Sequence, residues 1–572
     1  MTLRSEALYT RTEIAAPRGI CTGGHQAEAD AGVRILQAGG NAVDALVAAG
    51  FTAFVVEPRS CGVGGYGHTS VWLAAANRFV SFDHYVRAPL KARPDMFEPD
   101  WSVPPTYYGY PHAVGRHNVT GFLAPAVPGA VAGLCDAHAM FGRLPLKRVL
   151  EPAIEAAEAG VSFTWLDKMS IADRLPEIQA VAGDAELLLR ADGRVPQTPH
   201  QDPSGDVMDT SRLARLLKDI ARRGKRAFHG GAFARAIGRY MAANGGILSA
   251  ADLESYRTRI IEERPARYRG HHYVSCYDQV AYEALNILER YDLRKYGPDS
   301  FEYRHLMAEA LAVAFTDNIA QYGDPDFVRA PVNGLASPVF AAARARGLSL
   351  RRALPRPVRV MDAWPYEESF PPPEPLPEPT ATLGRTSGTS QVVAGDRWGN
   401  MAASCLSIGP GFGGMLYVPE LGIFLNGSMA NFDPRPGHPN SIAPGKMPIF
   451  AAPAIVAARG GRPRFAGSGS GNYRITTGVL HAMCGLIDFG QSLQQAVDSP
   501  KVHCQGQETY ADVRLPARLR DRLARVGHHV VEVEEGPSRL NFGRVCAIAW
   551  NARRKVWTAG AGPVWMTGVA GY

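Results

Sequence analysis

A proline-rich segment about two thirds of the way along the chain most constrains how this sequence can fold. Residues 370–380 read FPPPEPLPEPT, and six of these eleven residues are proline. Proline lacks a backbone N–H and fixes φ, so such a run is excluded from helix and sheet interiors. We expect an exposed, extended tether there, of the kind that tolerates chain cleavage.

The tether separates two parts of the chain that differ in hydrophobic periodicity. Before it, helical spacing predicts helices over Ala27–Ala38, Ala42–Ala53, Leu146–Ala159, Ser211–Arg223, Gly231–Asn244, Tyr282–Arg290 and His305–Tyr322, with early strands at Thr69–Ala74 and Phe79–Asp83. After it, β-prone runs on both sides of a DRWGN turn predict a hairpin formed by Thr389–Ala394 and Met401–Ser407. A helix-rich first part and a strand-rich second part indicate one layered body built from two segments.

Composition and charge exclude several classes of function. The 572 residues are 46% hydrophobic and 20% charged, with a net charge of +7, which is typical of a globular protein. The basic residues are scattered and form no stripe with aromatic residues, so no nucleic-acid partner is expected. Eight widely spaced cysteines without a CxxC pair argue against a zinc ribbon or a disulfide scaffold. No signal peptide or bilayer-length apolar run is visible, so we expect no membrane partner and a cytoplasmic location.

Two familiar functional motifs are not supported by this sequence. Gly62–Gly67 reads GVGGYG and fits GxGxxG, with Asp83 where a ribose-binding acid would stand. A dinucleotide site requires a strand, a turn and a helix in that order, whereas here a predicted helix precedes the glycines and strands follow them. No GxSxG sequence occurs, which argues against the serine nucleophile of an α/β-hydrolase.

The most informative short segment is RTSGTSQVV, in which Gly388 precedes Thr389. A threonine hydroxyl needs an adjacent base to act as a nucleophile. If Thr389 begins a chain, its own α-amine, with an unperturbed pKa near 7.7 to 8.0, supplies that base. A preceding glycine favours the strained turn that attack on the preceding carbonyl demands. Taken alone, the segment also fits an ordinary junction between a loop and a strand.

A longer series of motifs resembles the γ-glutamyltransferase family of N-terminal-nucleophile hydrolases. TSQVVAGDRWGN from Thr389 is similar to the start of that family's small subunit. The remaining motifs follow in the family's order, from about Gly19 to Tyr572: GGNAVDALVAAGFTAFVVEP at Gly39–Pro58, the glycines at Gly62–Gly67, DHYVRAPLKARPDMF at Asp83–Phe97, and Gly422–Lys446 with SIAPGK.

The resemblance implies a four-layer αββα sandwich and autocatalytic cleavage between Gly388 and Thr389. The large segment, 1–388, and the small segment, 389–572, would then remain together as a heterodimer. The family's supporting hydroxyl falls on Ser407. Its oxyanion loop, which supplies backbone N–H donors, falls on Gly469, Ser470 and Gly471. The acyl group would pass from Thr389 to water or an amine, and no cofactor or metal ion is expected.

The residues expected to bind a γ-glutamyl group are largely replaced in this chain. Tyr85 stands where the family has an arginine for the α-carboxylate, and we expect Arg87, two positions on, to bind one substrate carboxylate instead. The family's paired serines for the same carboxylate correspond to Phe450 and Ala451. Its three polar residues around the α-amine correspond to Gly409, Ser428 and Asn431. Since burying either charge of a glutamyl head unpaired costs several kcal/mol, glutathione is a poor fit.

These departures resemble the amidohydrolase branches of the family, such as the cephalosporin (glutaryl) acylases and oxamate amidohydrolase. We therefore predict hydrolysis of a small-molecule amide whose acyl part lacks a free α-amine. One alternative is a genuine γ-glutamyltransferase or glutathione hydrolase with different binding residues. The other is an inactive family member that serves as a scaffold or binding protein and stays uncut.

Overall fold

The structure, a computed structural model, describes residues 10–106, 109–180, 186–199, 201, 205–367, 388–449, 453–536 and 541–572. The proline-rich segment 370–380 lies outside these ranges, and so do Phe450 and Ala451. The predictions for the tether and for these two residues therefore stay predictions.

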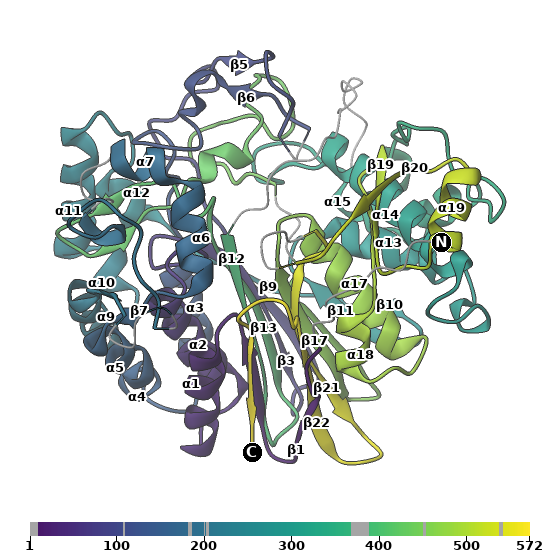
Figure 1. Ribbon diagram of the computed structural model, residues 1–572, viewed down its shortest axis with the longest axis horizontal. Coiled ribbons are helices and arrows are strands. Elements are labelled where there is room, and N and C mark those ends of the chain that lie inside the picture. Colours follow the sequence, from purple (N-terminus) through teal and green to yellow (C-terminus); the bar gives the residue numbers. More distant parts are fainter. Residues whose placement is uncertain are drawn as a thin grey trace.

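Two seven-stranded antiparallel sheets form the middle of the molecule (Figure 1). Sheet A contains, in spatial order, β1 (Ile14–Ala16), β22 (Val556–Ala561), β21 (Arg544–Asn551), β17 (Arg462–Ser470), β16 (Ile455–Arg459), β11 (His271–Ser275) and β10 (Ala266–Tyr268). Sheet B contains β23 (Gly568–Gly571), β2 (Ile20–Gly23), β12 (Gly388–Gly395), β13 (Met401–Gly409), β3 (Tyr66–Leu73), β4 (Arg78–His84) and β9 (Arg259–Glu262).

Helices cover the outer face of each sheet. The layer outside sheet B, on the left of Figure 1, contains α1 (Gln26–Gln37), α2 (Ala42–Val56), α3 (Ala130–Phe141), α5 (Glu151–Ala159), α9 (Ser211–Arg223) and α11 (Gly231–Ala243). The layer outside sheet A contains α13 (Gln279–Leu288), α14 (Phe301–Gln321), α17 (Arg474–Ile487) and α18 (Leu493–Asp498). This arrangement is the predicted αββα sandwich, which is confirmed.

Shorter elements complete the described chain. The helices among them include α4 (Leu146–Val149), α6 (Trp165–Asp173), α7 (Leu175–Ala180), α10 (Arg226–His229), α12 (Ala250–Ser255), α15 (Val332–Leu335), α16 (Pro338–Ala345), α19 (Ala517–Arg525) and the 3-10 turn η4 (Ser428–Asn431). A small sheet joins β18 (Val502–Cys504), β19 (Glu508–Asp512) and β20 (His529–Val533), and a hairpin joins β14 (Tyr417–Val418) to β15 (Ile423–Phe424).

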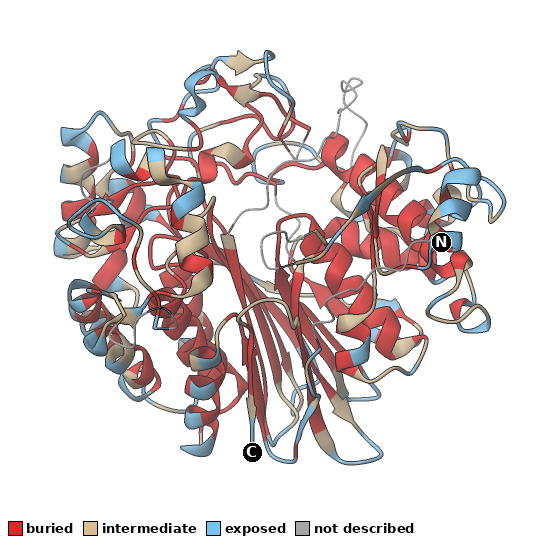
Figure 2. Cartoon of the chain, viewed as in Figure 1, coloured by how far each residue is buried: buried red, intermediate tan, exposed pale blue. Residues whose placement is uncertain are grey.

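Alternation along the strands explains the layers. In β12, Val392 and Ala394 pack in the core that sheet B shares with its helices. Val393, between them, packs in the core between the sheets together with Ile548 and Trp557 of sheet A. Successive side chains of a strand point to opposite faces of the sheet, so a strand that is buried on both faces needs apolar residues at successive positions. The sheets are accordingly buried along most of their length (Figure 2).

Helix α2 packs against β12, the strand that carries the candidate nucleophile. Asn41 and Asp44 form a capping box at its first turn, and all of its residues are buried. A helix that is apolar on every side belongs in a core, and α2 packs between sheet B and the outer helices. It ends at Val56, and its C-cap residue, Glu57, begins the connection to the glycine loop at Gly62–Gly67.

The predicted hairpin is confirmed as β12 and β13, and α9 has the predicted bounds. The single helix predicted over Leu146–Ala159 is wrong, because the chain breaks at Leu150 into α4 and α5. Pro152 has no N–H to continue the helical ladder. The helix-rich first part also supplies seven of the strands in the two large sheets, so both sheets combine strands from each side of the tether.

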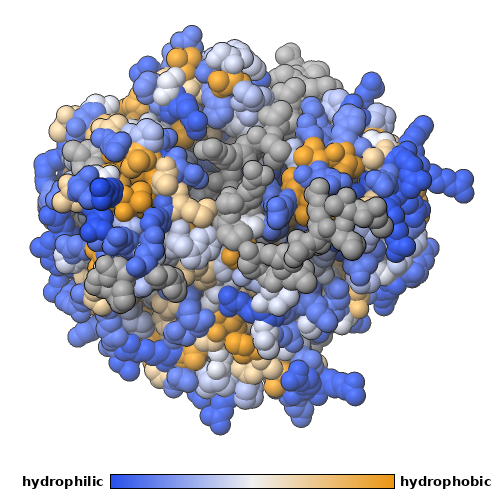
Figure 3. Space-filling view, viewed as in Figure 1, coloured by the Kyte–Doolittle hydropathy of each residue, from blue (hydrophilic) through white to orange (hydrophobic). Residues whose placement is uncertain are grey.

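No helix in the described part of the chain is long and apolar enough to cross a bilayer. The expected cytoplasmic location stays a prediction. All eight cysteines are buried and unpaired. Among the described residues, His, Cys, Asp and Glu side chains form no group able to hold a metal ion. The face seen in Figure 3 is mostly hydrophilic, with small separate apolar areas.

Candidate active site

Thr389 and Ser407 face each other at one end of sheet B. They are register partners on β12 and β13, and their hydroxyl oxygens lie 3.2 Å apart. Both follow the alternation that directs Val393 and Ala403 between the sheets, so their side chains point toward sheet A. Each is 2% exposed. The structure thus brings together the nucleophile and the supporting hydroxyl that the sequence predicts.

The carbonyl oxygen of Gly388 lies against both hydroxyls. Thr389 Oγ1 donates to it at 2.8 Å, and Ser407 Oγ lies 3.0 Å from it. The Gly409 N–H in turn donates to Ser407 Oγ at 3.1 Å. Pairing shifts register here, with Gly388 opposite Gly409 and Thr389 opposite Ser407, which leaves Ile408 as an extra residue of β13. Such bulges commonly redirect side chains beside active sites.

The backbone around residue 388 is tightly packed, which gives a steric reason for glycine at this position. A Cβ added to Gly388 would lie 2.3 Å from the carbonyl oxygen of Arg59. Real Cβ atoms do not approach an oxygen so closely, so any larger residue would displace the segment. Close approach of two backbones is a standard reason for glycine.

The predicted oxyanion loop lies at the end of β17, in sheet A. The Cys405 thiol of β13 contacts the carbonyl oxygen of Gly469 at 3.7 Å, which places this strand end across from β13. Ser470 is buried, and Gly471 has φ +123°, a conformation that favours glycine. The role of their N–H groups as oxyanion donors stays a prediction.

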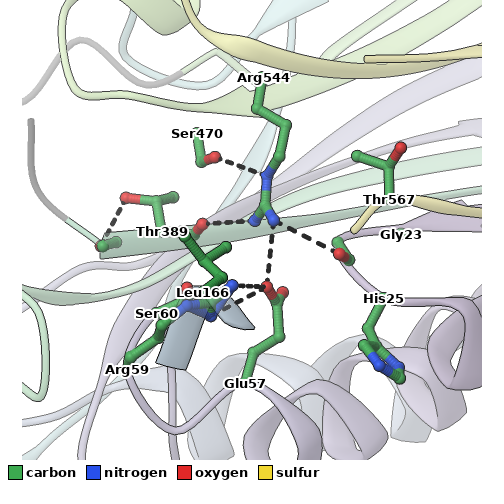
Figure 4. Close-up of polar contacts among 12 residues, drawn as sticks. Gly23, His25, Glu57, Arg59, Ser60, Leu166, Thr389, Ser470, Arg544 and Thr567 are labelled. Atoms are coloured by element: carbon green, nitrogen blue, oxygen red, sulfur yellow. Dashed lines mark hydrogen bonds and ion pairs between the residues drawn. The ribbon is translucent and has the colours of Figure 1, made fainter. Parts of the chain in front are cut away.

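Arg544 connects Thr389 in sheet B with the predicted oxyanion loop in sheet A (Figure 4). This residue was not identified from the sequence. It begins β21 and is 2% exposed. Its Nε donates to Ser470 Oγ at 2.9 Å, and its Nη2 donates to the Thr389 carbonyl oxygen at 2.9 Å. The one available signal was a charged residue at the start of an otherwise apolar strand, RVCAIAW.

The predicted acyl-binding residues Tyr85, Ser428, Asn431 and Gly409 form a neutral polar group beside Ser407. The Asn431 amide donates to the Tyr85 hydroxyl at 2.7 Å. A Cβ at Gly409, whose φ is +88°, would contact Ser428 Oγ at 3.4 Å, so these two residues are neighbours. The Ser428 N–H donates to Asn426 Oδ1 at 3.2 Å.

Tyr66, from the glycine loop, connects this polar group to the nucleophile. It is the register partner of Ser407 on β3, and its ring packs edge-on against Tyr85 at 4.6 Å. Burial raises the pKa of Tyr66, while hydrogen bonds with Ser407, Ser428 and Asn431 act in the opposite direction. The phenol is therefore neutral at physiological pH.

Arg87 already has an acidic partner, which it shares with the backbone N–H of Tyr85. Its Nη2 donates to Asp83 Oδ2 at 2.8 Å. Burial acts to raise the pKa of Asp83, but the charge of Arg87 outweighs it, together with hydrogen bonds to the carboxylate, and the pKa lies well below its usual range. Arg87 also lines a cavity whose other residues, among them Arg257 and Phe327, do not include Thr389. Its proposed role as a carboxylate-binding residue stays a prediction.

The sandwich and the threonine at the start of a sheet strand define an N-terminal-nucleophile hydrolase. Comparison with known proteins assigns the chain more closely. It belongs to the gamma-glutamyltranspeptidase family, whose sequence model matches residues 29–572. This assignment confirms the resemblance seen in the motifs.

Among its relatives, Acylase ACY 1 proenzyme of Pseudomonas sp. (strain V22) is 35% identical, over 96% of this chain and 94% of that protein. Glutathione hydrolase proenzyme of Bacillus subtilis (strain 168) is 27% identical, over 93% of this chain and 87% of that protein. The crystal structure of cephalosporin acylase from Bacillus halodurans superposes with a TM-score of 0.83 at 26% identity, covering 100% of this chain and 99% of that one.

Proposed function

We propose that the chain cuts itself between Gly388 and Thr389 and that the freed Thr389 then hydrolyses amides. The observation that carries this proposal is the contact of the Thr389 hydroxyl with the carbonyl of its preceding residue, 2.8 Å from oxygen to oxygen. A nucleophile held against its own peptide bond is arranged for an intramolecular attack.

In self-cleavage, Thr389 Oγ1 attacks the Gly388 carbonyl carbon and loses its proton. Charge develops on the Gly388 oxygen, toward which the Ser407 hydroxyl can donate at 3.0 Å. The C–N bond then breaks, the nitrogen takes up a proton, and Gly388 is left as an ester on Thr389. Water hydrolyses this ester, which releases the Gly388 carboxylate and regenerates the Thr389 hydroxyl beside the amine that breakage of the C–N bond has freed.

In turnover, the free α-amine of Thr389 takes the proton from its own hydroxyl as the oxygen attacks the substrate amide. The departing amine takes up that proton, and the acyl group remains on Thr389 as an ester. Water then attacks the ester and frees the acid. Segments 1–388 and 389–572 stay together as a heterodimer because β12 lies between β2 of one segment and β13 of the other.

We further propose that the acyl group lacks an α-amine. The residues near Ser407 at the acyl-binding positions, Tyr85, Ser428 and Asn431, are all uncharged, and Asn431 is committed to the Tyr85 hydroxyl. An α-ammonium placed there would lose its hydration without gaining an acidic partner. The relation to an acylase proenzyme is consistent with this substrate class.

The test combines processing with a pair of substrates. We expect purified protein to give two bands, with Thr-Ser-Gln at the new amino terminus, and the Thr389→Ala variant to remain one chain of 61.7 kDa. We expect glutaryl anilide to be hydrolysed with a higher kcat/KM than γ-glutamyl anilide. A γ-glutamyl preference, with transfer to glycylglycine, would instead identify a transferase, and an uncut wild-type protein would identify the inactive scaffold.

A further inference from the structure

The guanidinium of Arg544 is held by four acceptors from three parts of the fold. Besides Ser470 Oγ and the Thr389 carbonyl, Nη1 donates to Glu57 Oε1 at 3.1 Å and to the Gly24 carbonyl oxygen at 3.3 Å. These bonds join sheet A, sheet B and the end of α2 at one point, as Figure 4 shows. A planar fork of five N–H donors can bind all of these groups at once, whereas a lysine ammonium has three donors on a single nitrogen.

Glycines allow the acidic partner to come this close. A Cβ at Gly24 would lie 2.0 Å from Glu57 Oε2 and 2.9 Å from Arg544 Nη2, so only glycine leaves room for the pair. Similarly, a Cβ at Gly23 would lie 2.4 Å from Glu28 Oε2. The chain before α1 therefore packs directly against the ion pair, whose two side chains are each 1% exposed.

The charges around Arg544 come from several elements. Burial acts to raise the pKa of Glu57, but Arg544 and Arg59 outweigh it and lower the pKa, so Glu57 is ionised. Burial, followed by the charge of Glu57, raises the pKa of Glu28 well above its usual range, which favours the protonated, uncharged form of Glu28.

Two further ionisable groups lie around this pair. Arg59 also faces Asp167 of α6, with Nε 3.5 Å from Oδ1. Burial lowers the pKa of His25, which is therefore neutral at physiological pH. Arg544 is the cation that bonds directly to Thr389, and the charge that balances it lies on Glu57.

We propose that Arg544 is a positioning residue for the nucleophile: its guanidinium fixes Thr389 against Ser470, and its charge favours the unprotonated form of the amine that cleavage frees. This inference rests on the proposed function. The Thr389 nitrogen lies within about 6 Å of the guanidinium, since the nitrogen and carbonyl oxygen of one residue are about 3 Å apart. A cation at that distance disfavours protonation of the amine, and only the neutral amine can serve as base.

The test separates the geometry of Arg544 from its charge. Arg544→Lys keeps the charge but cannot span the acceptors, so we expect kcat to fall by about tenfold or more, with little change in KM and an unchanged acid limb of the kcat/KM profile. Arg544→Met removes the charge as well, so we expect its acid limb to move up by about one pH unit. Glu57→Gln should move the limb in the opposite direction, because it leaves the charge of Arg544 unbalanced.

Arg304→Met is the matched control. Arg304 is 1% exposed on α14 and contacts Tyr303 and His481 rather than the site, so its loss should lower the melting temperature without moving the acid limb. Arg544→Met could also remain uncut while its melting temperature stays close to that of Arg304→Met. This result would support the proposal, because the chain would be folded and Thr389 would have lost its alignment. If Arg544→Met fails to fold, Arg544→Lys decides.

The proposal is overturned if a folded Arg544→Lys cleaves itself and turns over at wild-type rates, or if Arg544→Met and Glu57→Gln leave the acid limb in place. Failure of the proposed function looks different. In that case the wild-type chain itself gives no Thr-Ser-Gln terminus, whatever the arginine variants do.

Discussion

Removing the Ser407 hydroxyl tests the arrangement around the Gly388 carbonyl most directly. That hydroxyl lies 3.0 Å from the carbonyl oxygen and 3.2 Å from Thr389 Oγ1, and it accepts the Gly409 N–H at 3.1 Å. Ser407→Ala therefore removes a donor from the oxygen on which charge develops during self-cleavage. It also leaves a buried backbone N–H without its acceptor.

The two losses have separate magnitudes. Removing one preorganised oxyanion donor slows a reaction by about 10²–10³-fold, or about 2.7–4 kcal/mol of activation free energy. Leaving the Gly409 N–H unpaired should lower the free energy of unfolding by about 1–3 kcal/mol. The variant should thus fold, melt at a lower temperature and accumulate as the uncut chain.

The assay follows conversion of the 61.7 kDa chain into two fragments on denaturing gels over time. Ser407→Thr, which keeps a hydroxyl, should cleave within about tenfold of wild type. Ser404→Ala is the matched control, because Ser404 is a buried serine on the same strand whose hydroxyl bonds Thr69 and the His68 carbonyl instead. If Ser407→Ala cleaves within about threefold of wild type, the hydroxyl does not act on the Gly388 carbonyl and the mechanism is refuted.

Three further predictions follow from individual residues. Gly388→Ala should slow self-cleavage by at least about tenfold, because its Cβ would lie 2.3 Å from a carbonyl oxygen, whereas Gly411→Ala, with nothing within 4 Å, should cleave normally on the same gels. Burial and the charge of Glu57 raise the pKa of Glu28 well above its unfolded value near 4.3, so Glu28 costs the folded protein stability as the pH rises above about 4 and costs none below it. Glu28→Gln, which mimics the protonated form, should therefore raise the melting temperature at pH 8, and this gain should shrink toward pH 4; an equal gain at both values would contradict the assignment. Asn431→Asp adds a carboxylate beside Tyr85 and should raise the γ-glutamyl to glutaryl ratio of kcat/KM by about tenfold, about 1.4 kcal/mol, in parallel anilide assays; an unchanged ratio would place the acyl pocket elsewhere.

Local sequence signals were sufficient where they agreed with the tertiary contacts. The hairpin that begins at Thr389 could be predicted because β-prone runs flank the DRWGN turn, and the structure extends it by only one or two residues at its ends. Helix α9 could be bounded because its amphipathic pattern stops at Gly224, which has φ +60°.

Other elements depend on partners that are distant in sequence. Strand β9, RIIE, is short and joins the edge of sheet B, so its alternation over four residues is too brief to distinguish it from a loop. Helices α13 and α14 begin earlier than predicted, at the side-chain caps of Asp278 and Ser300, because these caps extend each helix beyond its clearest apolar period.

The candidate site also contains some contacts that the sequence predicts and others that depend on residues distant in sequence. The proximity of Thr389 and Ser407 follows from the hairpin register, which the sequence contains. Arg544 could not be found, because its bond to Thr389 spans 155 residues and two sheets. Nor does the sequence reveal that Arg87 is neutralised by Asp83, since that depends on how the chain turns after β4.

The two ends of the described chain meet in the sheets. Strand β23, which ends at Gly571, pairs with β2 near the beginning, and β22 pairs with β1. A ribosome must therefore release the chain through β23 before sheet B can be completed, and Arg544 reaches Thr389 only after β21 has emerged. We expect no processing before that stage, so products truncated ahead of Arg544 should accumulate uncut.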